Sequence, residues 1–294
     1  MSWLIGSPRT HLGSVAHVTK RLQRFKETVK YATHWSQVPW RRLDDRSQLS
    51  TGEPQLIPRI VWQTGPNSHV NWRFGRYIDA FRTRNPEYEF RFLSDADVND
   101  YMITNFRGDD ILRIFEGARF GPMRADIFRY CVLLLHGGVY IDISKTLPKP
   151  LDSFVRVESS AVLTHEIHRI PEDYPVETHP QVHASDQLFV QWCIMCTSGH
   201  PLLIRVLDNI RRGASDVNGR VFANPGREIL KFTATYMWTK SIWQELAASG
   251  LNDIQIEGTD FGGQYSRIPE PYILNPFKRH YTRYRNMPIL RLGT

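Results

Sequence analysis

The stretch Gly121–Ser144, GPMRADIFRYCVLLLHGGVYIDIS, is the feature that most constrains how this chain can fold. Pro122 suits the first turn of a helix, and apolar residues fill the helix body up to Leu135. Gly137-Gly138 predicts the end of that helix, because glycine tolerates the left-handed backbone found there. The residues that follow alternate between apolar and polar types, as in a buried strand. The stretch therefore predicts a helix, a tight glycine turn and a strand.

The two predicted elements have matching lengths. About fifteen helical residues at roughly 1.5 Å each span about 22 Å, and about six strand residues at roughly 3.3 Å span about 20 Å. The helix start should therefore lie beside the strand end, where Tyr140, Asp142 and Ser144 share one face. Three charged residues occupy the helix start: Arg124, Asp126 and Arg129. This convergence of charges at a helix N-terminus predicts a site for a phosphorylated ligand and is compatible with a metal ion.

Composition narrows the class of protein. A chain of 294 residues with 41% hydrophobic residues can form one large or two small globular domains. The net charge of +7 favours anionic partners such as nucleotide sugars, acidic membranes or nucleic acid, although a basic protein without such partners has the same charge. Three cysteines make no disulfide framework, and Cys193 and Cys196 lack the further ligands of a zinc site. Buried thiols are expected.

The N-terminal part has a different character. Residues 15–35 have apolar side chains at helical spacing and basic residues on the remaining surface. Such a helix can lie on an anionic membrane or pack on its own domain with a solvated basic face. Residues 36–56 are predicted to be a linker, so the chain divides into a basic helical arm and linker at 1–56 and a catalytic-type domain at 57–294. MSWLIGSPRT lacks a signal-peptide core, which predicts a cytoplasmic protein, membrane-peripheral if the helix binds lipid.

Strands alternate with helices across residues 57–294. The expected strands are 60–62, 88–92, 139–144, 160–165, 188–196 and 254–256. The expected helices are 72–84, 95–106, 121–136, 202–210 and 229–246, with an exposed loop at 166–185. This order predicts an α/β sandwich with a mostly parallel sheet.

The central stretch resembles a known signature. RADIFRY…LLLHGGVYIDIS is similar to the donor site of DXD-motif glycosyltransferases, namely glycosyltransferase family 32 with its fungal outer-chain mannosyltransferase and capsular polysaccharide transferase relatives. Further similar segments are IPRIVWQTG at 57–65, NPEYEFRFLSD at 85–95, QWCIMCTSGHPLL at 191–203 and the turn Asn224-Pro225-Gly226. The resemblance covers roughly residues 57–243. It implies a GT-A-type nucleotide-sugar-binding α/β/α sandwich and retaining transfer of a hexose from a UDP- or GDP-sugar to a glycan, lipid or protein hydroxyl.

The resemblance also implies roles for individual residues. Asp126 and Arg129 match positions that hold donor-sugar hydroxyls, and Asp142 matches the first motif aspartate; these three form the implied catalytic set. The implied donor-binding residues are Trp62, Gln63, Thr64, Arg124, Tyr140, Asp142 and Ser144, of which the first three border the nucleotide base. The leaving phosphate is expected to accept the acceptor's proton, so no protein general base is assigned.

Ser144 departs from the family pattern, because it replaces the second motif aspartate. A hydroxyl is a poorer ligand than a carboxylate for Mn²⁺ or Mg²⁺. Three outcomes stay open: Asp142 and Ser144 bind the metal weakly, Asp260 or His280 adds a ligand, or activity has been lost. A non-catalytic nucleotide-sugar or glycan-binding protein is the alternative. Trp62 also stands where the family often has His, and Gly65 where it often has Trp, so the preferred base is expected to differ.

The remaining candidates are less specific. Asp186-Gln187 precede the strand at 188 and are candidates to face the acceptor, with a solvated loop carboxylate as the alternative. A nucleic-acid-binding protein or a metal-dependent phosphodiesterase is a further rival on charge, but the sequence contains no aromatic-basic RNA motif, and no nucleic-acid partner is expected. A protein-glucosylating toxin subunit stays open within the glycosyltransferase interpretation.

Overall fold

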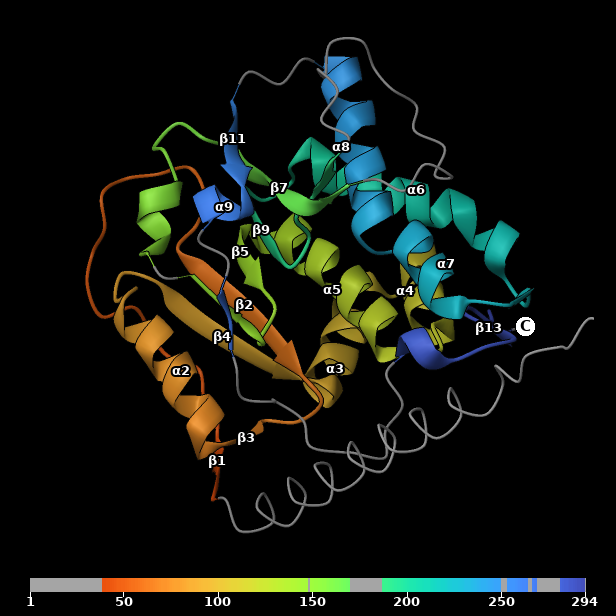
Figure 1. Ribbon diagram of the computed structural model, residues 1–294, viewed down its shortest axis with the longest axis horizontal. Helices are drawn as coiled ribbons and strands as arrows, with labels where there is room; N and C mark the ends of the chain where they lie inside the picture. The colour runs from red at the N-terminus through yellow and green to blue at the C-terminus, as the bar shows by residue number, and fades with distance from the viewer. Residues whose placement is uncertain are drawn as a thin grey trace, which may run out of the picture.

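The computed structural model describes residues 39–147, 149–169, 187–249, 253–263, 266–268 and 281–293. The predicted basic helix at 15–35 lies outside these residues. Within them, a seven-stranded sheet is flanked by helices on both faces (Figure 1). None of the described helices combines the length and the apolar character needed to cross a membrane.

The strands are β1 (Trp40–Arg42), β2 (Ile60–Gly65), β3 (His69–Asn71), β4 (Glu89–Ser94), β5 (Gly138–Ile141), β6 (Lys145–Thr146), β7 (Ala161–Arg169), β8 (Gln187–Phe189), β9 (Cys193–Cys196), β10 (Val221–Phe222), β11 (Ile254–Thr259), β12 (Ser266–Arg267) and β13 (Met287–Pro288). The helices are α2 (Trp72–Thr83), α3 (Asp95–Phe106), α4 (Asp110–Gly117), α5 (Gly121–His136), α6 (Pro201–Val217), α7 (Pro225–Phe232), α8 (Thr235–Ser249) and α9 (Asp260–Gly263), with short 3₁₀ turns η1 (Leu151–Phe154) and η2 (Tyr281–Arg283).

The central sheet has the strand order β11-β7-β9-β5-β2-β4, with β8 paired to β7. β2 is parallel to both β4 and β5, and β11 is parallel to β7. β9 runs antiparallel to β5 and β7, and β8 runs antiparallel to β7. Five of the seven strands therefore point the same way, which confirms the predicted α/β class with a mostly parallel sheet.

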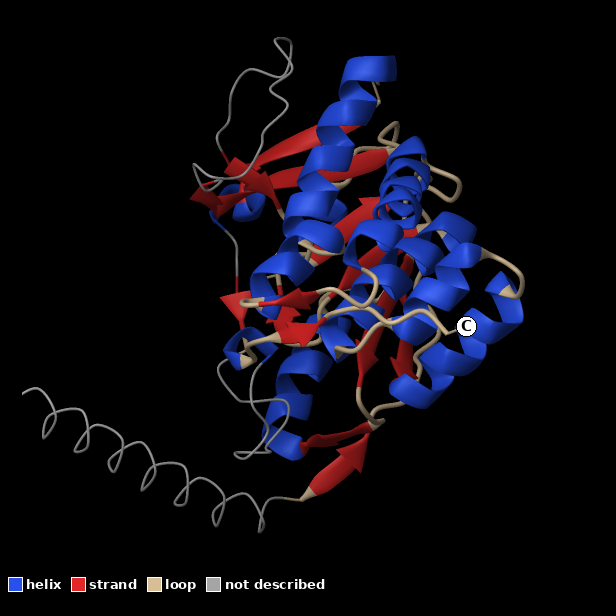
Figure 2. Ribbon diagram, turned by 90° about the vertical axis from the view of Figure 1, so that its right-hand side faces the viewer, coloured by secondary structure: helices blue, strands red, loops and turns tan. Residues whose placement is uncertain are grey.

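Alternating side chains of the strands fill two separate cores. On β2, Val61 packs with Phe90 and Phe81 on the side of α2, whereas Trp62 packs on the side of α5. Helices α3 to α8 cover the second face, and α2 and η1 cover the first (Figures 1 and 2). The result is the three-layered sandwich that the sequence predicts. The three cysteines are free and buried, as expected.

The predicted glycine turn joins α5 to β5. Gly137 has φ +66° and Gly138 has φ +98°, both in the region that favours glycine. A Cβ atom on Gly138 would lie 2.5 Å from the carbonyl oxygen of Ile60 on β2. The turn thus lets β5 approach β2 closely and returns the chain along α5.

Replacing Gly138 by Ala is expected to lower the free energy of unfolding by about 3 kcal/mol, because backbone strain and a backbone clash add together. Gly108→Ala is the matched control, since Gly108 has φ +87° but open space where a Cβ atom would lie. Strain alone at Gly108 should cost about 1–2 kcal/mol. Urea denaturation measures the free energy of unfolding of both variants. Equal losses of unfolding free energy in the two variants would contradict the close approach of Gly138 to Ile60.

The predicted linker is wrong for its described part, residues 39–56. β1 pairs with β3, and the Arg46 guanidinium donates to the carbonyl oxygens of Arg82, Asn85 and Tyr88 at 2.5, 2.6 and 2.8 Å. Arg82 lies in the last turn of α2, and Asn85 and Tyr88 follow the end of this helix. The domain therefore already includes residues before position 57, and polar composition did not reveal this because the partners are distant in sequence.

Several element boundaries differ from prediction. The predicted strand at 188–196 is two strands, β8 and β9, separated by residues 190–192. The predicted helix at 229–246 is two helices, α7 and α8, separated by Thr233 and Ala234. Helix α4 was not predicted. Both interruptions lie beside the charged cluster described next.

Candidate active site

The start of α5 and the end of β5 meet, and the structure brings Asp126, Arg129 and Asp142 together. One Arg129 nitrogen, Nη2, lies 3.1 Å from Asp126 Oδ1 and 3.2 Å from Asp142 Oδ1. Asp126 and Arg129 are three residues apart, so they lie on the same face of α5. The helix–turn–strand arrangement thus produces the convergence expected from the sequence.

Exposure differs sharply within this cluster. The side chains of Asp126 and Arg129 are each 6% exposed, whereas that of Asp142 is 34% exposed. Asp142 Oδ2 has no partner among the described residues, and only Oδ1 contacts Arg129. A ligand that approaches the cluster therefore meets Asp142 first.

Burial and charge set the ionisation of the cluster. Burial raises the pKa of Asp126 to about 6, with Arg129 opposing this effect. Burial alone would lower the pKa of Arg129, but Asp142 and Asp126 raise it above its usual range. The Arg129 guanidinium also lies 4.7 Å from the Tyr140 ring centroid. Because Arg129 bridges Asp126 and Asp142, one guanidinium faces two acidic side chains in this cluster.

The raised pKa of Asp126 predicts a pH-dependent stability difference. Its pKa shifts from 3.8 to about 6 on folding, so charging Asp126 destabilises the fold as pH rises through this window. Asp126→Asn does not titrate, so its unfolding free energy relative to wild type should rise by roughly 2–3 kcal/mol between the acid and neutral ends of the window. Denaturation series at several pH values measure this difference in unfolding free energy. A difference that does not change with pH would contradict the raised pKa of Asp126.

Two residues that sequence reasoning missed hold Asp126 from the other side. Gln191 Nε2 lies 3.2 Å from Asp126 Oδ1, and Thr233 Oγ1 donates to Asp126 Oδ2 at 3.0 Å. The Gln191 carbonyl oxygen accepts a hydrogen bond from Arg129 Nη1 at 2.8 Å. Gln191 is the first residue of the segment QWCIMCTSGHPLL that carries part of the family resemblance, so the sequence did contain a signal that could have identified it as a site residue. Thr233 had none, because the predicted helix ran through it.

Thr64 and Tyr140 lie next to the cluster, and their predicted donor-binding role stays a prediction. Their hydroxyl oxygens are 3.0 Å apart, because β2 and β5 are parallel neighbours. Tyr140 is buried beneath Arg129, and burial raises the pKa of its phenol to about 12. The half-buried Thr64 is the member of this pair nearer to solvent.

Trp62 and Gln63 occupy core positions instead of an open site. Trp62 Nε1 donates to the Gly137 carbonyl at 3.0 Å, and its ring contacts His136 with centroids 5.4 Å apart. Gln63 is 1% exposed, and neither polar atom of its amide has a partner among the described residues. Neither side chain is accessible in this structure, so their predicted role beside a base remains a prediction.

Arg124 points toward α4. Its Nε donates to the Phe115 carbonyl at 3.3 Å, and its guanidinium lies 4.6 Å from the Phe115 ring centroid. The last carbonyls of a helix attract cations, which accounts for this placement near the end of α4. The expected convergence of Arg124 with Asp142 is therefore wrong.

Ser144 does not share a strand face with Asp142. β5 ends at Ile141, and the Lys145 N–H donates to the Asp142 carbonyl at 2.8 Å in a turn that contains Ser144. Strand alternation therefore stops before Ser144, and the predicted common face is wrong. The Ser144 carbonyl accepts a hydrogen bond from the Ile268 N–H at 3.0 Å, which ties this turn to a distant segment.

The predicted metal ligands Asp260 and His280 and the predicted acceptor-side residues Asp186 and Gln187 complete the candidate set. Asp260 is buried at the end of β11 with φ +45°, and its charge adds to burial in raising the pKa of Glu166 to about 7. His280 and Asp186 lie outside the described residues, and Gln187 is half-buried at the start of β8. The described parts of the chain contain no group of three or more His, Cys, Asp or Glu side chains arranged to hold a metal.

Asp142 nevertheless fits part of a magnesium or manganese site. These ions often bind one or two carboxylates and complete their shell with water and substrate phosphates. Asp142 offers a partly exposed carboxylate, one oxygen of which has no partner among the residues that the structure describes, and the Ser144 hydroxyl belongs to the following turn. The donor set suits an ion held largely by its substrate.

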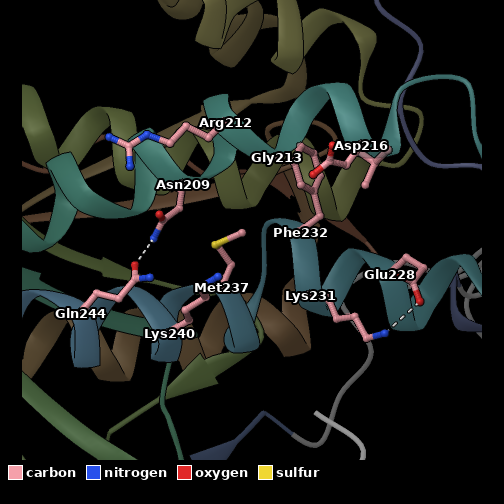
Figure 3. Close-up of a pocket in the computed structure, with 11 residues that line it drawn as sticks. Asn209, Arg212, Gly213, Asp216, Glu228, Lys231, Phe232, Met237, Lys240 and Gln244 are labelled. Atoms are coloured by element: carbon pink, nitrogen blue, oxygen red, sulfur yellow. Dashed lines mark hydrogen bonds and ion pairs between the residues drawn. The ribbon is translucent and has the colours of Figure 1, made fainter. Parts of the chain in front are cut away.

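Two surface hollows lie away from this cluster. One of about 480 Å³ lies between α6 and the α7–α8 pair (Figure 3). Within it, Lys231 pairs with Glu228 at 3.2 Å, and Asn209 donates to Gln244 at 2.8 Å (Figure 3). The other, of about 550 Å³, lies on α2 beside Trp72 and Tyr77. Neither hollow is lined by Asp142, and the candidate site is the cluster, because its charged groups converge on a partly exposed carboxylate.

Comparison with known proteins identifies this region. Residues 72–161 match the family described as "Glycosyltransferase sugar-binding region containing DXD motif". The initiation-specific alpha-1,6-mannosyltransferase of Schizosaccharomyces pombe is 25% identical over 194 residues, which cover 65% of this chain and 49% of that protein. Inositol phosphoceramide mannosyltransferase 2 of the same organism is 32% identical over 122 residues, covering 40% of this chain and 33% of that protein. The solved PaToxG glycosyltransferase is 15% identical with a TM-score of 0.45, covering 66% of this chain and 71% of that chain.

This chain spans about half the length of the first curated relatives that it matches. The matched range 72–161 contains α5, the glycine turn and β5, and hence Asp126, Arg129 and Asp142. The resemblance to DXD-motif glycosyltransferases is therefore confirmed for residues 72–161, which are similar to the sugar-binding region of that family.

Proposed function

We propose that this chain is a glycosyltransferase that moves a hexose from a UDP- or GDP-sugar to an acceptor hydroxyl with retention of configuration. The observation that carries the proposal is the Asp126–Arg129–Asp142 cluster inside the matched sugar-binding region. Similar proteins are named as mannosyltransferases, which makes mannose the first sugar to test.

The exposure of each residue in the cluster indicates its role in the proposed reaction. Asp142 contacts the donor, because its carboxylate is the accessible part of the cluster. Arg129 fixes one oxygen of Asp142 and leaves the other for the ligand. Asp142 and Ser144 would hold a bound Mn²⁺ or Mg²⁺, which supplies charge stabilisation for the leaving diphosphate. The departing phosphate accepts the acceptor's proton, so the cluster needs no additional base.

The acceptor is a glycan, lipid or protein hydroxyl in this proposal. Similar proteins include an enzyme named for an inositol phosphoceramide acceptor, which supports a lipid arm in the acceptor test. Gln187 is the described residue that we place on the acceptor side, since it begins β8 close to the segment that carries Gln191. Peripheral membrane contact through residues 15–35 remains a prediction.

A donor panel tests the function. UDP- and GDP-linked hexoses, including GDP-mannose, are incubated with the protein with and without Mn²⁺, and nucleotide release is followed. One donor should be turned over faster with Mn²⁺ than without it. Binding of a donor without turnover would instead support the alternative, a non-catalytic nucleotide-sugar-binding protein, for which the motif serine is the motivating observation.

Ser144→Asp is expected to tighten Mn²⁺ binding by about tenfold, because a carboxylate is a better ligand than a hydroxyl for a hard cation. Calorimetric titration of Mn²⁺ in the presence of nucleoside diphosphate measures the change. Ser153→Asp in η1 is the matched control, since Ser153 is exposed on a different element. Unchanged affinity in the Ser144 variant would show that this side chain does not face the ion.

A further inference from the structure

Two interruptions in the chain, far from α5 in sequence, meet at the charged cluster. One is the segment Val190–Trp192 between β8 and β9, and the other is the break at Thr233 between α7 and α8. Both lie outside residues 72–161, the range that matches the sugar-binding region.

The first interruption contacts all three members of the cluster. Through its side chain, Gln191 reaches Asp126, and through its carbonyl it accepts from Arg129. The next carbonyl, that of Trp192, accepts the Asp142 N–H at 2.8 Å. Two consecutive residues thus fix Asp126, Arg129 and Asp142 relative to one another.

The second interruption supplies a buried hydroxyl. Thr233 is fully buried, and its Oγ1 lies 3.0 Å from Asp126 Oδ2 but 3.5 Å from the Ile229 carbonyl. Its carbonyl accepts the Tyr130 hydroxyl at 3.0 Å, which anchors the break to α5. The hydroxyl's shorter contact is therefore the one to the carboxylate.

These contacts account for both oxygens of Asp126. Oδ1 faces Arg129 and Gln191, and Oδ2 faces Thr233. A buried carboxylate that lost the Thr233 contact could rotate about its terminal torsion, which is broad. Because one Arg129 nitrogen bridges Asp126 and Asp142, rotation at Asp126 would move the group that holds Asp142.

We propose that Thr233, together with Gln191, is a positioning residue that orients Asp126 so that Arg129 holds Asp142 toward the donor. The inference rests on the proposed glycosyltransferase function and deepens it, since it makes the α7–α8 junction part of the catalytic unit. Thr233 touches no substrate in this account and acts only through Asp126.

The order of two variants tests the proposal. Thr233→Val keeps the shape and removes the hydroxyl, whereas Thr233→Ser removes the methyl group and keeps the hydroxyl. We expect Thr233→Val to lower kcat by about tenfold or more with KM within about threefold, and Thr233→Ser to stay within about threefold of wild type. A packing role predicts the reverse order, with Val tolerated and Ser impaired, and that result would overturn the proposal.

Thr239→Val is the matched control. Thr239 is a fully buried threonine on α8 whose hydroxyl oxygen accepts the Phe189 N–H at 2.9 Å, away from Asp126. Loss of the Thr239 hydroxyl should lower the melting temperature of the protein without the decrease in kcat that is expected for Thr233→Val. A similar drop in kcat for both variants would indicate general damage and contradict a specific role for Thr233.

A second measurement separates this inference from the proposed function. If the wild type turns over no donor in the panel, the function fails, and the contact is then tested by melting temperatures alone. Thr233→Val is compared in the wild-type and Asp126→Ala backgrounds, or in Asp126→Asn should the alanine variant not fold. If Thr233→Val lowers the melting temperature less in the Asp126 variant than in the wild type, the Thr233–Asp126 contact is supported. Equal decreases in melting temperature in both backgrounds would overturn it.

Discussion

Asp142→Asn is expected to lower donor turnover by about 10²–10³-fold, the usual loss when one charge-stabilising group is removed from an active site. Asp142 is the accessible acidic side chain of the cluster, and it is the residue that we propose contacts the donor and the metal. Asparagine has the same shape and can still accept from Arg129, so the free energy of unfolding should change by only about 1 kcal/mol. Nucleotide release and urea denaturation measure the two quantities on the same preparation.

Asp110→Asn is the control for this substitution. Asp110 lies in the first turn of α4, is exposed, and pairs with Arg113 at 3.4 Å. The Asp110 variant therefore also loses an acidic group paired with an arginine, but at an exposed pair outside the cluster. Its turnover should match wild type. Full turnover by the Asp142 variant would reject the site.

Arg129→Met is expected to produce the largest loss of stability, about 3–5 kcal/mol, because it leaves a buried carboxylate without its cation. The Arg129 side chain is 6% exposed and contacts both Asp126 and Asp142. Methionine fills much of the volume, so the loss reports mainly the unpaired charge. Urea denaturation at neutral pH measures it.

Two comparisons test whether the loss of stability in Arg129→Met comes from the unpaired charge or from lost packing. Arg113→Met removes a surface arginine from an i,i+3 pair and should cost only about 0.5 kcal/mol. Adding Asp126→Asn to Arg129→Met removes the stranded charge and should recover part of the lost stability. If the double variant is as unstable as the sum of the single variants, the loss comes from packing, and the electrostatic account is wrong.

Local signals explain what the sequence could predict. Pro122 at the start of α5, two glycines with positive φ at its end and matched element lengths depend only on neighbouring residues. These signals are enough to predict that Asp126, Arg129 and Asp142 lie together. Local patterns also predict α2 and α3, and the structure shows side-chain caps at Asn71 and Ser94.

Long-range contacts explain what could not be predicted. The Thr233–Asp126 contact joins residues 107 positions apart, and nothing around Thr233 marks the end of α7. Arg46 binds carbonyls 36 to 42 positions away, so its segment has the composition of a linker. The position of Ser144 was predicted wrongly because the length of β5 depends on how its neighbours in the sheet pair, which periodicity alone does not reveal.

The central claim is that a nucleotide sugar binds at the Asp142 end of this cluster. A crystal structure of the protein with Mn²⁺ and the donor selected by the panel tests it most directly. The account predicts the diphosphate beside Asp142, between the end of β5 and the start of α5. A donor bound elsewhere, for instance in the hollow between α6 and the α7–α8 pair, with Asp142 untouched, would contradict it.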